Sequence, residues 1–343
     1  MPLLGTDLAA GRGEEGFVRV LAIVASLALA AIAPTAAQSE QGQDPQPLFR
    51  SGISLVALNV TVTGPDKRFV TGLDVDDFAV YEDGIQQDLQ FFQSSAVPLD
   101  LIMLIDASSS MRHRLDLVHQ AALGFVSTLR QGDRGAVVAF SDHVSVVQGL
   151  TGDRALLDSA IRGIAANGGT ALHNAVYVAL KQFGRGARDT SLVRRQALAV
   201  LSDGNDTASL LSFDDVLDVA HKSGVSIYPI SLASELDAPP AGGSRQFSQA
   251  QYSMRKLAQE TGAQAFFPTK VQQLPEIYAA IAEELSYQYS IGYAPRDSRS
   301  DGRFRRIVVR CTSRPELKPR ARTGYVALSN SAAASYLGEI RLP

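Results

Sequence analysis

Between Pro98 and Leu285 the chain alternates short apolar runs with segments of helical periodicity, which restricts the fold more than any other feature of the sequence. The run LDLIMLI at 99–105 is apolar but for one aspartate, as expected for a strand buried on both faces of a parallel sheet. Apolar residues then recur every three or four positions from Leu115 to Leu129, which is one stripe of a helix. Such alternation predicts an α/β fold with a doubly wound, mostly parallel sheet.

The same patterns predict the remaining elements of this region. Further strands are expected at 135–140, 144–150, 196–202, 225–232 and 264–268. Further helices are expected after the capping residues Asp153 and Ser212, from Leu172 onward, and at 249–262 and 274–285. In sheets of this kind ligands bind beyond the carboxyl ends of the strands, so the residues that follow each strand are the candidates for function.

Both flanks of this region have strand patterns. Apolar and polar residues alternate from Val56 to Val62, and an Asp-Gly pair at 83–84 suits a tight hairpin turn. Strand periodicity returns in 287–329. We therefore predict that 48–95 and 287–329 pack together as a small β-module next to an α/β domain at 96–286, with a C-terminal tail at 330–343.

The N-terminus has the order of a secretory signal. Arg19 precedes the short apolar run VLAIVASLALAAIA, and small residues follow around Ala37. A signal peptide over 1–37 and a linker over 38–47 are predicted, with an uncleaved anchor as the alternative and a true start near Val18. The mature protein is then exported to the periplasm, the cell envelope or the extracellular space.

Composition excludes several classes of protein. A hydrophobic content of 45% and a charged content of 20% are those of an ordinary globular chain. The formal net charge of -3 gives no indication of nucleic-acid binding. The single cysteine, Cys311, excludes an intramolecular disulfide.

Five oxygen-bearing side chains follow the predicted strands or precede a helix. Asp106, Ser108 and Ser110 form Asp-x-Ser-x-Ser after the first strand, Thr170 follows Gly-Gly before a helix, and Asp203 ends a later strand. Carboxylate and hydroxyl oxygens without nitrogen or sulfur suit a hard cation such as Mg²⁺. Turn residues and helix caps that bind no metal are the alternative.

With these motifs the sequence resembles the von Willebrand factor A domain family, and its flanks resemble bacterial VWFA-related proteins found especially in acidobacteria. The resemblance implies a metal-ion-dependent adhesion site for Mg²⁺ or Mn²⁺ formed by Asp106, Ser108, Ser110, Thr170 and Asp203. Of these we expect Asp203 to act through water, which leaves one position of the ion open. It also implies a non-catalytic domain whose protein partner donates an Asp or Glu side chain to the metal. The function expected is that of an exported binding or adhesion-type protein.

Two other functions remain open. A structural envelope protein would use the metal only to stabilise its loops, and a metal-assisted hydrolase would need a general base near the metal. The sequence has neither His-Glu-x-x-His nor a Gly-x-Ser-x-Gly elbow. His173, close to Thr170, could line the metal site or lie on a helix surface.

A run of cationic residues near the C-terminus suggests a second surface. Its members are Arg303, Arg305, Arg306, Arg310, Arg314, Lys318, Arg320 and Arg322. This run could bind an anionic polysaccharide or phospholipid surface, or it could be a solvated face of a strand.

Overall fold

The central sheet of the α/β domain has the strand order β7-β6-β5-β8-β9 in the computed structural model, which describes residues 55–94, 97–186, 194–203, 206–232 and 249–328. Its strands are β5 (Leu99–Asp106), β6 (Arg134–Phe140), β7 (Val144–Thr151), β8 (Arg195–Ser202) and β9 (Ser226–Ser231). Four of them are parallel, and the edge strand β7 is antiparallel to β6. The predicted doubly wound, mostly parallel sheet is confirmed.

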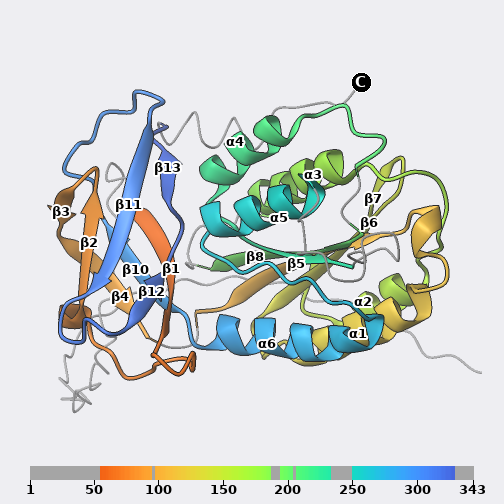
Figure 1. Ribbon diagram of the computed structural model, residues 1–343, viewed down its shortest axis with the longest axis horizontal. Coiled ribbons are helices and arrows are strands. Elements are labelled where there is room, and N and C mark those ends of the chain that lie inside the picture. Colours follow the sequence, from red (N-terminus) through yellow and green to blue (C-terminus); the bar gives the residue numbers. More distant parts are fainter. Residues whose placement is uncertain (1–54, 95–96, 187–193, 204–205, 233–248, 329–343) are drawn as a thin grey trace, which may run out of the picture. The chain divides into compact units, whose positions relative to one another are not determined.

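Helices cover both faces of this sheet (Figure 1). They are α1 (Leu115–Ser127), α2 (Arg154–Arg162), α3 (Leu172–Gly186), α4 (Phe213–Ser223), α5 (Gln249–Glu260) and α6 (Leu274–Ser286). The side chains of β5 alternate between the two cores, with Leu101 and Met103 against α1, α2 and α6 and Ile102 and Leu104 against α3, α4 and α5. This alternation explains why β5 is apolar on both faces.

The strand predicted at 264–268 is wrong. Phe266 alone makes a parallel bridge, to Ile230 of β9, through hydrogen bonds to the main chain of Pro229 and Ser231. Pro268 follows two residues later and has no N–H to continue a ladder, so the pairing stops there.

Among the described residues, the flanks form two four-stranded antiparallel sheets, ordered β12-β1-β10-β4 and β13-β11-β2-β3. The N-terminal strands are β1 (Val56–Thr63), β2 (Phe78–Glu82), β3 (Ile85–Gln87) and β4 (Leu89–Gln93), and the C-terminal strands are β10 (Tyr289–Tyr293), β11 (Phe304–Cys311), β12 (Lys318–Arg320) and β13 (Gly324–Val326). Each sheet contains strands from both flanks, and the two sheets share one hydrophobic core. The predicted β-module is therefore formed by strands that precede and strands that follow the α/β domain.

The hairpin between β2 and β3 has the predicted Asp-Gly turn. Asp83 and Gly84 both have positive φ, at 48° and 85°, which is the conformation that a two-residue hairpin of this twist requires. The following strand β4 leaves this hairpin and pairs with β10 in the other sheet.

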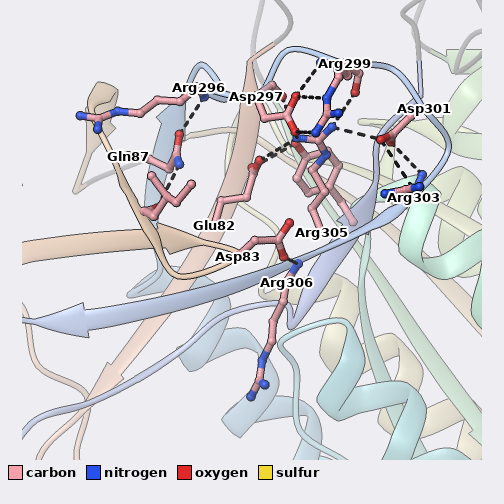
Figure 2. A network of polar contacts seen from close by, with 12 residues as sticks. Glu82, Asp83, Gln87, Arg296, Asp297, Arg299, Asp301, Arg303, Arg305 and Arg306 are labelled. Atoms are coloured by element: carbon pink, nitrogen blue, oxygen red, sulfur yellow. Dashed lines mark hydrogen bonds and ion pairs between the residues drawn. The ribbon is translucent and has the colours of Figure 1, made fainter.

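Figure 2 shows how the loop between β10 and β11 wraps around the buried guanidinium of Arg305. This group lies 3.0 Å from Asp297 Oδ2 and 3.4 Å from Glu82 Oε1, and it donates to the main-chain oxygens of Asp297 and Arg299. Glu82 also accepts a hydrogen bond of 2.7 Å from the Tyr293 hydroxyl. A buried charge of this kind is stable only when it is paired and fully hydrogen-bonded, so Arg305 organises the β-module.

Residues 1–54 and 329–343 lie outside the described part of the chain, and with them the predicted signal peptide, linker and C-terminal tail. No helix among the residues that are described combines the length and apolar character of a membrane span.

Candidate metal site in the α/β domain

The candidate residues lie beside the point in the sheet where the strand order reverses, between β5 and β8. From β5 the chain proceeds through α1 to β6 on one side, while β8 pairs with β5 on the other side. Asp106 is the last residue of β5, and Asp203 directly follows β8. The two carboxylates therefore lie at the carboxyl ends of neighbouring parallel strands, which is where such sheets bind ligands.

A row of short hydrogen bonds joins four of the five predicted residues. The main-chain N–H of Ser108 donates to Asp106 Oδ1 at 2.8 Å, and the hydroxyls of Ser108 and Ser110 are 2.9 Å apart. The Ser110 hydroxyl donates to Asp203 Oδ2 at 2.7 Å. The first and third segments of the predicted site thus converge.

Thr170 lies on a loop that is bonded to the first one. The N–H of Ser109 donates to Gly168 O at 3.1 Å, and the N–H of Asn167 donates to Ala107 O at 2.8 Å. Thr170 is 5% exposed. Its N–H donates to the Thr207 hydroxyl at 3.1 Å, whereas its own hydroxyl makes no hydrogen bond to another described residue. The backbone of Thr170 is therefore held in place and its hydroxyl is available to a ligand.

The carboxylate of Asp106 is completely buried. Burial, together with the nearby charge of Asp203, raises the pKa of Asp106, although hydrogen bonds from Ser108 and Ser202 oppose this effect. The side chains that act on the Asp106 carboxyl are those of Ser108, Ser202 and Asp203, and no Arg, Lys or His side chain of the described residues is among them. A buried carboxylate without a cation is costly, and a bound metal ion would offset that cost.

The donor set restricts which metal fits. In the described part of the chain no three His, Cys, Asp or Glu side chains come together in a way that could hold a metal ion. A metal site here must therefore use the hydroxyls of Ser108, Ser110 and Thr170 beside the two carboxylates. Oxygen ligands of this kind fit Mg²⁺ or Mn²⁺ better than a metal that prefers nitrogen or sulfur.

Comparison with known proteins identifies the domain. The family model for the von Willebrand factor type A domain matches residues 100–280, which is more than half of the chain. The chain belongs to the von Willebrand factor type A (VWA) domain family. Domains of this family commonly mediate adhesion or contacts between proteins, are generally not enzymes, and often bind a divalent metal.

Several relatives share this domain. The UPF0353 protein of Nocardia farcinica is 24% identical over 221 residues, which cover 58% of this chain and 64% of that protein. An uncharacterised protein of Synechocystis is 30% identical over 113 residues, which cover 32% of this chain and 26% of that protein. The chain thus spans less than two thirds of the length of these relatives.

Solved structures that match the chain include two bacterial examples. A von Willebrand factor type A protein from Catenulispora acidiphila has a TM-score of 0.44 at 14% identity and covers 83% of this chain and 77% of its own. The vWF domain of the type V pilus tip protein Mfa5 from Porphyromonas gingivalis has a TM-score of 0.45 at 16% identity. The match covers 56% of this chain and 96% of that one.

Two residues that support the site of the VWA domain were missed from the sequence. The hydroxyl of Ser202 donates to Asp106 Oδ2 at 2.6 Å, and Thr207 holds the main chain of Thr170 on both sides. Ser202 directly precedes Asp203 at a strand end, so its position in the sequence could have indicated that it lies close to the site. No sequence pattern marks Thr207, because its contact depends on how a loop folds back.

His173 is held through its Nδ1 by two polar partners. Its Nδ1 lies 2.7 Å from Asp206 Oδ2 and 3.1 Å from Leu211 O. The ring borders a cavity of about 570 Å³ between α3, α4 and α5 that is lined mainly by apolar residues such as Val176 and Met254. His173 thus lies half-buried in a polar cluster at the start of α3.

The cationic run near the C-terminus divides into two groups. Arg305, Arg320 and Arg322 are buried or half-buried and bond to Glu82, Glu284 and the main chain of Ala57. The exposed members are Arg303, Arg306, Arg310, Arg314 and Lys318. The exposed group is therefore the one that presents most of its charge to an anionic surface, and such contact remains a prediction.

Gly168 provides a test of how the loop before Thr170 is held. Its φ is +68°, and a Cβ added there would lie 2.8 Å from the Asp142 carboxyl group. We expect Gly168→Ala to lower the free energy of unfolding by about 1–2 kcal/mol and to weaken Mg²⁺ binding. Urea unfolding in EDTA and calorimetric titration of Mg²⁺ measure the two effects. Gly124→Ala in α1, where an added Cβ meets nothing, is the control and is expected to be neutral or stabilising. Unchanged stability and binding in Gly168→Ala would contradict the expectation.

Proposed function

We propose that the chain is an exported, non-enzymatic binding protein whose VWA domain holds Mg²⁺ or Mn²⁺ and through it a protein partner. Asp106, Ser108, Ser110 and Thr170 would bind the ion directly or through water, and Asp203 through water. The observation that carries this proposal is the hydrogen-bonded row from the buried Asp106 to Asp203, in which the Asp106 carboxylate has no described Arg, Lys or His side chain beside it.

The charges of the site favour a binding role. Two carboxylates balance a divalent ion, while hydroxyl ligands donate little electron density, so the ion remains a good acceptor. If Asp203 binds only through water, one coordination position stays open for an Asp or Glu side chain of the partner. Such binding needs no nucleophile and no general base.

The domain boundaries belong to the same proposal. A signal peptide at 1–37 and a linker at 38–47 would precede the β-module segments at 48–95 and 287–329, with the VWA domain at 96–286 and a tail at 330–343. Export to the periplasm, the cell envelope or the extracellular space follows from the composition of the first 37 residues.

Calorimetric titration of Mg²⁺ and Mn²⁺ into the metal-free chain tests the site directly. We expect saturable binding that Thr170→Val weakens by roughly tenfold, because one ligand oxygen is lost, about 1.4 kcal/mol. Thr63→Val, on strand β1 of the β-module, is the matched control. Absence of binding to the folded wild type would refute the metal site.

Capture experiments in Mg²⁺ and in EDTA test the partner. A protein that is retained in Mg²⁺, released by EDTA and lost with Thr170→Val would support the adhesion function. Metal binding without such a partner would favour the structural envelope protein instead, and metal-dependent hydrolysis abolished by Thr170→Val would favour the hydrolase.

A further inference from the structure

A polar crevice of about 210 Å³ lies where strands β1 and β10 of the β-module meet the start of β8 and the end of α4. Four cationic residues line it, namely Arg194, Arg195, Lys222 and Arg322. No Asp or Glu is among the described residues that line this crevice. The lining therefore has an excess of positive charge.

Two polar atoms of the lining are buried without a hydrogen-bond partner in the described part of the chain. They are the hydroxyl oxygen of Ser290, a residue that is 5% exposed, and Nε of Arg322. Ser290 lies opposite Asn59 in the pairing of β10 with β1, and both residues line the crevice. Buried polar groups are nearly always hydrogen-bonded, so these two atoms indicate a missing ligand or water.

The cationic residues of the crevice differ in whether a carboxylate is paired with them. Arg194 forms an ion pair with Asp100 at 2.7 Å, and Lys222 pairs with Asp218. The Arg322 guanidinium donates to the main-chain oxygen of Ala57 at 3.0 Å and lies over the Tyr325 ring at 5.5 Å from its centroid, but it forms no ion pair with a described carboxylate. Burial lowers the pKa of Arg322, which is the direction expected for a charge without a counter-ion.

We propose that this crevice binds a small oxyanion of the phosphate class, with the Arg322 guanidinium and the Ser290 hydroxyl as donors. A guanidinium offers paired N–H groups that match two oxygens of a phosphate, and a hydroxyl supplies a further donor. The volume is below the roughly 300 Å³ at which pockets for drug-sized ligands begin, which suits a small anion with some water.

This site is separate from the proposed metal site, so it is tested in EDTA. Calorimetric and thermal-unfolding titrations of the full chain compare phosphate, sulfate and glycerol 3-phosphate with chloride at equal ionic strength. We expect saturable phosphate binding with a Kd below about 1 mM and a rise in Tm that chloride does not reproduce. Tighter binding of glycerol 3-phosphate would indicate a phosphate carried by a larger molecule, and weaker binding would indicate the free anion.

Substitutions of residues in the crevice test whether phosphate binds there. Arg322→Gln should weaken phosphate binding at least tenfold, about 1.4 kcal/mol, and Ser290→Ala should weaken it several-fold. Arg310→Gln removes the same charge from an exposed position on β11 and should bind as the wild type does. If Arg322→Gln fails to fold, Ser290→Val replaces it, since it removes the hydroxyl and narrows the crevice. Equal stabilisation by chloride, equal loss in Arg310→Gln, or unchanged binding in the crevice variants would overturn the proposal and leave water as the occupant.

Discussion

Replacing Asp106 by asparagine is expected to weaken Mg²⁺ binding by at least roughly 100-fold, about 2.7 kcal/mol, while the metal-free protein keeps its stability. The carboxylate is fully buried, and Asp203 repels it, so its charge is unfavourable until a cation binds. Asparagine keeps an acceptor for the N–H of Ser108 and can still hydrogen-bond to Ser202. The free energy of unfolding in EDTA should therefore stay within about 1 kcal/mol of the wild type or exceed it.

Calorimetric Mg²⁺ titration and urea unfolding in EDTA measure both parts of this prediction. Asp142→Asn is the matched control, because Asp142 is exposed, lies at the same edge of the sheet and hydrogen-bonds to His143 at 2.8 Å. We expect this control to bind Mg²⁺ as the wild type does. A variant at Asp106 that loses much stability in EDTA but still binds Mg²⁺ would identify Asp106 as a structural residue of the loop.

Removing Glu284 is expected to have the largest effect on stability. This carboxylate of α6 is 2% exposed and accepts hydrogen bonds from the Tyr228 hydroxyl at 2.9 Å and the Thr61 hydroxyl at 3.3 Å. It also forms an ion pair with Arg320. Glu284→Ala should lower the free energy of unfolding by about 3 kcal/mol, because it leaves three groups without their shared acceptor. This loss is at the lower end of the range usual for breaking a buried ion pair, because the Arg320 side chain is 34% exposed and water can solvate its charge.

Urea unfolding of Glu284→Ala beside Glu283→Ala tests this expectation. Glu283 is the preceding residue of α6 and is exposed, so its removal should change stability by no more than about 0.5 kcal/mol. Similar losses in the two variants would mean that the buried ion pair contributes nothing specific to folding. Because Thr61 and Arg320 belong to the β-module, a large loss would also measure how strongly it supports the VWA domain.

Local chemistry in the chain was enough to predict much of the fold. The apolar run from Leu101 to Ile105 in β5 requires burial on both faces, and the Asp-Gly pair requires positive φ. The capping pair of Ser212 and Asp215 begins α4 as expected. Each of these features depends on residues within a few positions of one another. The strand wrongly predicted near Phe266 has the right composition but lacks a continuing N–H at Pro268.

By itself, the sequence determined the alternation of strands and helices and hence the α/β fold, and it supplied the five oxygen-bearing residues proposed as ligands after two strands and before a helix. Only the tertiary structure decided which distant residues complete these features. Ser202 supports Asp106 and Thr207 supports Thr170. Likewise Arg305 turns inward to Glu82 while its neighbour Arg306 stays exposed. The physical reason is that strand ladders and helix stripes follow from local periodicity, whereas the partners of buried polar groups depend on contacts between segments far apart in the chain.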